Sequence, residues 1–391
     1  MEKGYNFTKD DKGIPCVYHE WQSLNGETLG NLFSPSKYSR SGDDPDQVIE
    51  QYVKNTDERS IETRSSLKGE LNVSVGGNTR QTVDLFIPEN VSQDAPVLVF
   101  YHGGYWQFLS QVDKISDSEK AFSFIPRIKN QEVKYLYKLY DSKESHSMVA
   151  RHLVPLGAIV AVAGYTIAPK GSVTQMIQEC KEAVAFCARR YPKSRGIFVS
   201  GHSAGGHLAA MVLTTDWEKE FGLPSNLIKG ACPLSGVFDL RPLVTTYINE
   251  PLHLTSTSAL ESSPVAHIPK IVANSKHCKI RCLYGDHEPP SFEIMCIQFC
   301  QLLREEGMDI SCQKVKDADH FELFLSVWEE HSVVTKKVLY ELLGKKRKRE
   351  RSDPTIKVGF SYLAEKKSIC SSRVAFSRGK MKKERNDEKN K

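Results

Sequence analysis

Short apolar segments alternate with amphipathic stretches along most of the chain, and this alternation restricts its fold more than any other feature. Seven segments rich in aliphatic and aromatic residues lie between turn residues, as buried strands do. These predicted strands are Val83–Ile87, Pro96–Tyr101, Gly157–Gly164, Gly196–Ser200, Gly230–Leu234, Lys279–Tyr284 and Ile310–Val315. The stretches between them carry apolar residues at spacings of three and four, which is typical of amphipathic helices. Helices are predicted near Asp46–Arg64, Val173–Tyr191, Phe292–Glu306 and Phe321–Leu343. Strands alternating with helices form parallel βαβ units, so the sequence predicts an α/β domain with helices on both faces of a mostly parallel sheet.

Composition divides the chain into regions. Residues 1–80 are polar and turn-rich, and we expect them to pack on an α/β domain that spans residues 81–343. Residues 112–148 are charged and rich in Tyr and Lys, and they interrupt the alternation. They are either a lid-like insertion or extra sequence without a structural role, such as translated intron. Residues 344–391 have few periodic apolar residues, and we expect a disordered tail.

The net charge of +5 is unevenly distributed. From Lys345 to Lys391 there are 17 lysines and arginines against 6 acidic residues, which leaves the rest of the chain mildly acidic. The basic run Lys345–Arg349 predicts nuclear localisation or, equally, a solvated tail with no receptor. The cytosol is the expected default location, and nucleic acid is not an expected partner.

The chain also lacks the usual signals for membranes and secretion. Its longest apolar runs, such as Ala95–Tyr101 and Ala158–Ala163, are too short to cross a bilayer, and the N-terminus has no apolar signal segment. The ten cysteines form no CxxC pair and no zinc-finger spacing. We therefore expect reduced, mostly buried thiols and no metal.

One short motif predicts a nucleophile. Gly201-His-Ser-Ala-Gly205 matches G-x-S-x-G, and it lies directly between a predicted strand and a predicted helix that extends to Leu213. That context is the one a nucleophile elbow requires, with a serine on a strained turn and small residues on either side. The helix dipole at this turn favours a developing alkoxide. Ser203 is the predicted nucleophile.

A second motif predicts an oxyanion hole. His102-Gly-Gly-Tyr-Trp106 follows a strong strand, and open α/β sheets place their sites at the carboxyl ends of strands. Glycines let backbone N–H groups approach a substrate oxygen closely. Gly103 and Gly104 are the predicted donors, together with the N–H of Ala204 after the nucleophile. Tyr105 and Trp106 are expected to line a substrate pocket or to pack beside the loop. For Trp106 the two expectations have equal weight.

A base and an acid complete the expected order of serine, acid and histidine along the chain. His320 follows the last predicted strand and is the predicted base, whereas His331 falls in the middle of the predicted final helix. Glu288 lies three residues after Gly285, where hydrolases of this kind usually carry the acid. Asp286 remains the alternative acid.

These residues resemble the kynurenine formamidases, or arylformamidases, a family of α/β-hydrolases. The resemblance rests on the HGGxW motif at His102–Trp106 together with further segments in the family's order over roughly Tyr18–Leu343. Those segments are Gly164–Gly171, Gly201–Ala209, Ser235–Leu240, Gly285–Phe292 and Asp317–Glu322. The family usually carries Asp at the position of Glu288, so the longer side chain is a departure.

The resemblance implies an α/β-hydrolase fold and hydrolysis of N-formyl-L-kynurenine to L-kynurenine and formate in tryptophan breakdown. It implies Ser203, His320 and Glu288 as the triad, a small aryl formamide as substrate, no metal or cofactor, and a homodimer. Two alternatives stay open on sequence alone. One is a carboxylesterase or lipase that cleaves small acyl esters, and the other is a noncatalytic binding protein that kept the fold.

Overall fold

The computed structural model describes residues 8–9, 15–16, 19–76, 81–107, 143–337 and 343. The chain divides into two units, Met1–Lys345 and Lys346–Lys391, and the described residues all belong to the first. The predicted tail at 344–391 therefore lies outside them. Across the described ranges, no helix combines the length and the apolar character needed to cross a bilayer.

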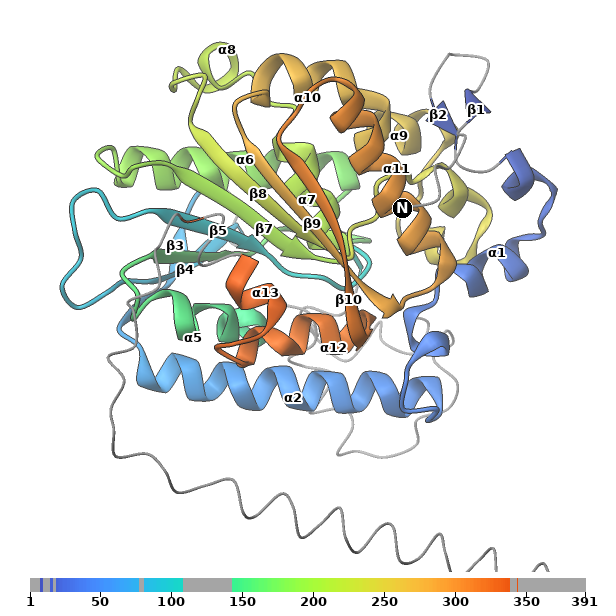
Figure 1. The fold of residues 1–391 in the computed structure, drawn as a ribbon, viewed down its shortest axis with the longest axis horizontal. Helices are drawn as coiled ribbons and strands as arrows, with labels where there is room; N and C mark the ends of the chain where they lie inside the picture. Colours follow the sequence, from blue (N-terminus) through green and yellow to red (C-terminus); the bar gives the residue numbers. More distant parts are fainter. Residues whose placement is uncertain are drawn as a thin grey trace, which may run out of the picture. The chain divides into compact units, whose positions relative to one another are not determined.

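A twisted sheet of eight strands forms the centre of the first unit (Figure 1). The strand order is β10-β9-β8-β7-β5-β6-β4-β3. All neighbours from β10 to β6 run parallel, while β4 and β3 are antiparallel to their neighbours. The strands are β3 (Gly69–Ser74), β4 (Thr82–Phe86), β5 (Val97–Tyr101), β6 (Ile159–Ala163), β7 (Ile197–His202), β8 (Ile228–Leu234), β9 (Lys279–His287) and β10 (Ile310–Asp319). A separate pair, β1 (Thr8–Lys9) and β2 (Pro15–Cys16), is antiparallel.

Strands β5 and β6 are apolar and buried throughout, as expected where both faces of a sheet are covered. In β5, Val97, Val99 and Tyr101 point into one hydrophobic cluster, whereas Leu98 and Phe100 point into a second. This alternation is the two-residue period of a strand. The edge strand β3 is mostly exposed instead, which explains why its sequence gives no apolar signal.

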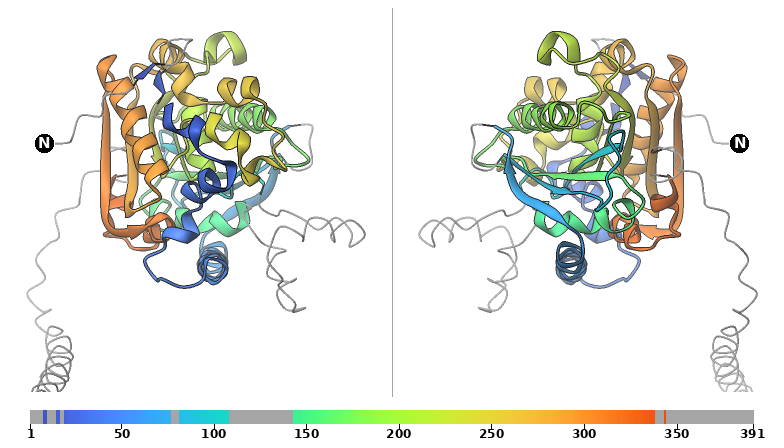
Figure 2. Two further views of the ribbon diagram at one scale, coloured as in Figure 1. Left: turned by 90° about the vertical axis from the view of Figure 1, so that its right-hand side faces the viewer. Right: turned by 90° about the vertical axis from the view of Figure 1, so that its left-hand side faces the viewer.

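Helices cover the two faces, as Figures 1 and 2 show. One face carries α6 (Val173–Arg190), α7 (Ala204–Val212) and α11 (Pro290–Glu305), whose apolar residues join the first cluster. The other carries α2 (Pro45–Ser66), α5 (Ala150–Leu153) and α12 (His320–Leu325), which contribute to the second. The remaining helices are α1 (Gly26–Leu32), α8 (Trp217–Phe221), α9 (Ser256–Glu261), α10 (Ile268–Ser275) and α13 (Val333–Lys336). The short 3₁₀ helices are η1 (His19–Ser23), η2 (Pro35–Tyr38), η5 (Lys143–Val149), η6 (Arg241–Thr245), η7 (Tyr247–Asn249), η8 (Pro264–His267) and η9 (Ser326–Trp328).

The structure confirms all seven predicted strands and the predicted mostly parallel sheet. The single helix predicted for Phe321–Leu343 is wrong. The chain forms α12, then η9, then an exposed turn, and α13 begins after Ser332. The four residues 329–332 are polar, so a helix there would have no apolar face to bury. His331 accordingly lies in this turn, exposed, and not in the middle of a helix.

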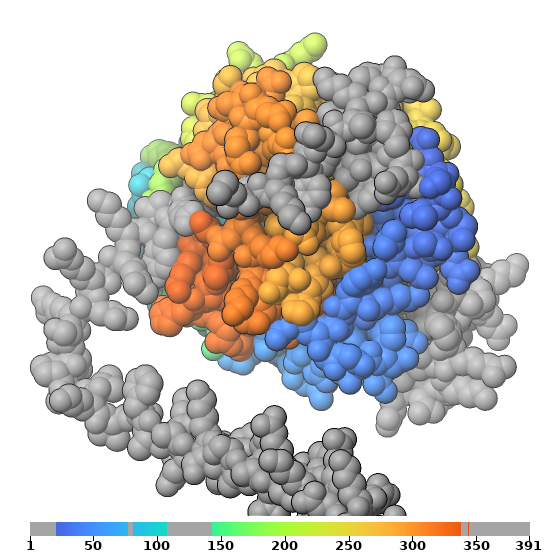
Figure 3. Space-filling view, turned by 45° about the vertical axis from the view of Figure 1, so that its right-hand side comes forward, coloured from blue at the N-terminus to red at the C-terminus, as the bar shows by residue number. Residues whose placement is uncertain are grey.

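The N-terminal segment and the interrupted region both contribute to the core. In Figure 3 the early residues lie directly against the late ones, and α2 packs on α12 and η5. Residues 112–142 of the predicted insertion lie outside the described residues. Residues 143–148, its last six, are almost entirely buried in η5. There the Lys143 ammonium donates to Asp84 Oδ1 at 2.9 Å. Residues 143–148 therefore belong to the α/β core.

Candidate active site

Ser203 lies on a sharp turn between β7 and α7, with φ 57° and ψ −117°. L-residues rarely adopt this conformation, and such strain is typical of functional sites. The flanking glycines permit it. A Cβ on Gly205 would lie 2.0 Å from the Tyr101 carbonyl oxygen, and one on Gly201 would lie 2.3 Å from the Gly205 oxygen. Both clashes are with backbone, so α7 can approach β5 this closely only with glycine at these positions.

The HGGxW loop packs against this turn. A Cβ on Gly103 would lie 3.5 Å from the Ser203 Cβ and 3.1 Å from the His202 carbonyl oxygen. Gly104, Tyr105 and Trp106 then follow with positive φ values of 98°, 51° and 60°. The three left-handed residues turn the chain sharply away from the end of β5. The loop therefore brings its glycine backbone next to the serine side chain, and the Ala204 N–H begins α7 on the other side.

His102 holds the start of this loop. Its ring stacks on Tyr165 with centroids 4.2 Å apart and planes at 5°. Its Nδ1 donates to the Gly103 carbonyl at 2.9 Å, and the Tyr165 hydroxyl donates to the His102 carbonyl at 2.9 Å. Burial lowers the pKa of His102 to about 4, so its ring is neutral near pH 7. These contacts fix the loop without adding charge beside the serine.

Trp106 is fully buried and does not line a pocket. Its indole N–H donates to His207 Nδ1 at 3.1 Å, and His207 Nε2 donates to the Ser262 carbonyl at 2.6 Å. The two rings meet edge to face, with centroids 5.0 Å apart. Of the two readings left open by the sequence, packing beside the loop is therefore the right one. Tyr105 is also buried, and its hydroxyl donates to the Phe33 carbonyl.

Glu288 and His320 meet at the carboxyl ends of β9 and β10. His320 Nδ1 donates to Glu288 Oε2 at 2.7 Å, and both side chains are almost fully buried. The other carboxylate oxygen, Oε1, accepts from the Ser235 hydroxyl and, at 3.3 Å, from the Gly285 N–H. Because Nδ1 carries a proton, Nε2 of the neutral ring is free to accept one. The pair is thus arranged as the acid and base of a triad.

Asp286 contacts other groups. Its Oδ1 accepts from the Ala318 N–H at 3.1 Å and lies 3.7 Å from His287 Nε2. Burial alone would raise the pKa of Asp286, but backbone hydrogen bonds, including those from Asp317 and Ala318, together with the nearby His287 lower it below its ordinary value. The hydrogen bond to Ala318 holds the carboxyl end of β10. The geometry therefore favours Glu288 over Asp286 as the partner of His320.

The turn at Ser203 lies beside the pair formed by Glu288 and His320. His202, the residue before Ser203, donates from Nε2 to the His320 carbonyl at 2.9 Å, and the two rings have centroids 4.6 Å apart. Ser203 in turn donates its N–H to the Leu234 carbonyl at 2.8 Å, next to Ser235. The predicted site residues are thus brought together at the carboxyl edge of the sheet, where open α/β sheets place their sites.

A clasp of three residues, Ser39, Arg40 and Asp319, joins the N-terminal segment to the histidine loop. Asp319 Oδ2 accepts from the Ser39 hydroxyl at 2.9 Å and from the Arg40 N–H at 3.0 Å. Its Oδ1 caps α12 by accepting from Phe321 N and Glu322 N. The next residue along the chain is His320. Sequence reasoning missed this clasp, together with the supporting roles of Ser235, His207 and Ser262.

Comparisons with known proteins agree with this geometry. A family model described as alpha/beta hydrolase fold matches residues 137–320. Proteins named kynurenine formamidase from Danio rerio and Salmo salar are each 32% identical over 328 residues, which is 83% of this chain and 99% of theirs. A solved structure from Silicibacter sp. TM1040, assigned provisionally as a thioesterase, superposes with a TM-score of 0.60 at 24% identity over 79% of this chain and 98% of its own. That likeness supports the fold alone, whereas the two fish relatives show the family. The chain belongs to the kynurenine formamidase family of α/β-hydrolases.

Proposed function

We propose that the chain hydrolyses N-formyl-L-kynurenine to L-kynurenine and formate, with Ser203 as nucleophile, His320 as base and Glu288 as acid. The observation that carries the proposal is the contact of 2.7 Å between Glu288 and His320, beside a strained serine turn, in a member of this family. The substrate follows from the name of the relatives, and the mechanism follows from the arrangement of the residues.

In the first half of the reaction, Ser203 Oγ attacks the formyl carbon while His320 Nε2 takes the hydroxyl proton. The carbonyl oxygen becomes an oxyanion, and the N–H groups of Gly103, Gly104 and Ala204 stabilise it. One such donor typically contributes about 3–4 kcal/mol to the transition state. The C–N bond then breaks, and the protonated His320 returns the proton to the departing aryl amine. A formyl ester remains on Ser203.

In the second half, a water attacks the formyl ester while His320 takes one of its protons. The oxyanion forms in the same hole, the ester bond breaks, and the proton on His320 passes to Ser203 Oγ. Formic acid leaves and ionises to formate by giving its proton to solvent. Glu288 stays ionised throughout, keeps the proton on His320 Nδ1 and stabilises the imidazolium in each half. Its second oxygen remains bound by Ser235 and Gly285, so the carboxylate does not rotate away.

Formate release from N-formyl-L-kynurenine tests the proposal, with the full-length protein compared with Ser203→Ala. We expect turnover in the wild type and its loss in the variant, and labelling by a fluorophosphonate probe of the wild type alone. A short aryl ester assayed in parallel separates the alternatives. A folded, probe-reactive protein that cleaves the ester but releases no formate would establish the esterase alternative. A folded protein that the probe does not label would establish a noncatalytic one.

We further propose that the protein resides in the cytosol and enters the nucleus through Lys345–Arg349. The support is the basic run itself, which lies outside the described residues. Changing these five residues to alanine in a fluorescently tagged full-length protein is expected to abolish nuclear enrichment. An unchanged distribution would refute nuclear entry through this run.

We also propose that the enzyme is a homodimer, as the family resemblance suggests. Multi-angle light scattering on the purified full-length protein is expected to give twice the chain mass of 44.1 kDa. A single-chain mass at micromolar concentration would contradict this.

A further inference from the structure

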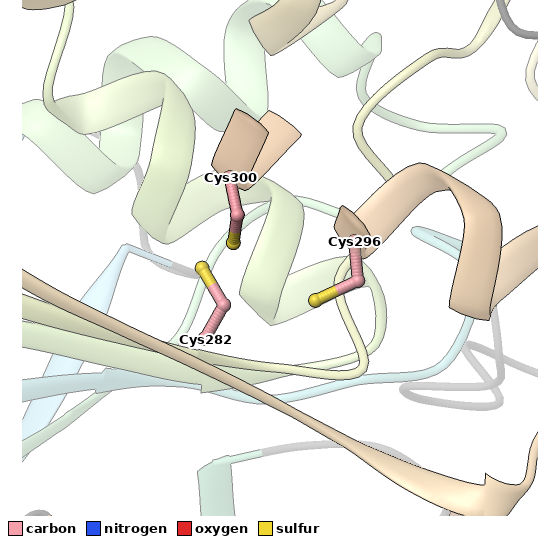
Figure 4. A group of neighbouring side chains, drawn as sticks. All are labelled: Cys282, Cys296 and Cys300. Atoms are coloured by element: carbon pink, nitrogen blue, oxygen red, sulfur yellow. The ribbon is translucent and has the colours of Figure 1, made fainter. Parts of the chain in front are cut away.

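Three cysteine sulfurs converge between the sheet and a helix (Figure 4). Cys282 lies on β9, while Cys296 and Cys300 lie one turn apart on α11. Their sulfur atoms all lie within 4.8 Å of one another, and the three residues are at most 1% exposed. Figure 4 shows the side chains pointing toward a common point, not stacked along the helix. Among the described residues, this is the group of three or more His, Cys, Asp or Glu side chains whose spacing suits a metal ion.

A fourth thiol connects the group to the surface. Cys312 on the edge strand β10 is the register partner of Cys282, and it is partly exposed. Its sulfur lies 3.7 Å from that of Cys296. An ion entering beside β10 would therefore meet Cys312 first and pass to Cys296. A metal site needs such an entry path, and here it is short.

The chemistry of the group suits a soft cation. Thiolates select soft and borderline ions such as Cu⁺, Zn²⁺ and Cd²⁺ over the hard ions that prefer oxygen ligands. All three side chains offer sulfur as the ligand atom, so the group presents a soft ligand set to an ion.

We propose that Cys282, Cys296 and Cys300 form a binding site for one thiophilic divalent cation of the zinc and cadmium class. Tetrahedral Zn–S bonds of about 2.3 Å place the sulfurs about 3.8 Å apart. The sulfurs lie within 4.8 Å of one another, so contraction to that spacing moves each of them by about 1 Å at most. Binding through three thiolates releases one proton from each thiol that is protonated, and the occupied group, with three thiolates and one divalent cation, carries a net charge of −1.

The site connects the two elements on either side of Glu288. Cys282 lies on the strand that ends at His287, and the other two ligands lie on the helix that begins at Pro290. A bound cation therefore crosslinks β9 to α11 and adds its binding free energy to the stability of the folded chain. This inference does not depend on the proposed reaction.

Cadmium titration of the full-length protein tests the site, because Cd–thiolate bonds absorb in the ultraviolet whereas bonds to oxygen or nitrogen do not. The titration uses a Cys16→Ser/Cys370→Ser background under a phosphine reductant, which removes the two cysteines whose side chains the structure does not describe. We expect the charge-transfer band to saturate at one equivalent with the amplitude of three thiolates. The thermal unfolding midpoint should rise with Cd²⁺.

A matched pair of variants identifies the ligands. Cys300→Ala should weaken Cd²⁺ binding by at least tenfold, as a lost ligand does. Cys187→Ala removes a fully buried cysteine of α6 outside the group, and it should leave the Cd²⁺ affinity unchanged. The proposal is overturned by the absence of a charge-transfer band in the folded background protein. It is also overturned if Cys300→Ala leaves the Cd²⁺ affinity, measured from the charge-transfer band, unchanged. The background protein keeps all three cysteines of the group, so the first outcome decides even where Cys300→Ala fails to fold.

Discussion

The ring of His202 donates a hydrogen bond from Nε2 to the main-chain oxygen of His320, at 2.9 Å. This contact joins the residue before Ser203, the proposed nucleophile, to His320, the proposed base, although 118 positions separate His202 and His320 in the chain. The ring is buried, and burial lowers the pKa of His202 well below its ordinary value, so it holds the loop as a neutral donor. His202 is therefore a positioning residue for His320.

Replacing His202 with leucine should lower kcat by about 10–100-fold, because a base displaced by about 1 Å loses its alignment with the serine. KM should change little, because His202 positions His320 and is not a proposed contact of the substrate. His202→Asn, which keeps a donor, should recover part of the loss. Steady-state kinetics on folded variants check this. A raised KM with unchanged kcat would assign His202 to substrate binding instead.

The two carboxylates near β9 should behave differently when neutralised. Glu288→Gln keeps the shape but removes the charge that orients His320, and a fall in kcat of about 10⁴-fold is expected. Asp286→Asn should cost less than tenfold, because Asp286 bonds to the Ala318 N–H and an amide oxygen can replace it. Single-turnover rates of formate release, measured for Glu288→Gln and Asp286→Asn, test this difference. Equal losses in the two variants would show that Glu288 is not the specific partner of His320.

The clasp at Asp319 predicts a graded loss of stability. Asp319→Ala removes both the cap of α12 and the contacts to Ser39 and Arg40, and the cap alone is worth about 1–2 kcal/mol. Asp319→Asn retains an oxygen for the cap but loses acceptors for the clasp, so its free energy of unfolding should fall less. Urea unfolding measures both. If the two variants unfold at the same midpoint, the cap contributes nothing.

Buried histidines should make the fold sensitive to acid. Burial lowers the pKa of His207 from its ordinary value of 6.5 to about 4 in the folded chain. The unfolded chain therefore binds more protons between these values, and stability present above pH 6.5 is lost as the pH falls toward 4. The full loss for this residue is about 3 kcal/mol. His207→Gln should flatten this part of the pH dependence in urea unfolding at pH 8 and pH 5. The exposed His331→Gln is the control, and equal slopes for the two variants would contradict the assignment.

The elements that the sequence predicted well are those whose signals are local. The central strands β5 and β6 are apolar along their whole length, and the glycines around Ser203 are required by contacts within the turn and with β5. The positions of His320 and Glu288 follow from strand ends, because a residue that follows a parallel strand lies at the same edge as its neighbours. The prediction of one helix over 321–343 was wrong, because helix propensity does not show at which residue a helix stops having an apolar face to bury.

What the sequence by itself determined is the kind of fold, the elbow and the residue types of the triad, since each depends on a short stretch of chain. Only the tertiary structure decided which distant groups meet. Trp106 packs on His207 and not on a substrate pocket, Ser235 holds the second oxygen of Glu288, and Ser39 binds Asp319. The thiols of β9 and α11 converge for the same reason. Such contacts join elements far apart in the chain, and they depend on how helices and strands pack, which no local pattern records.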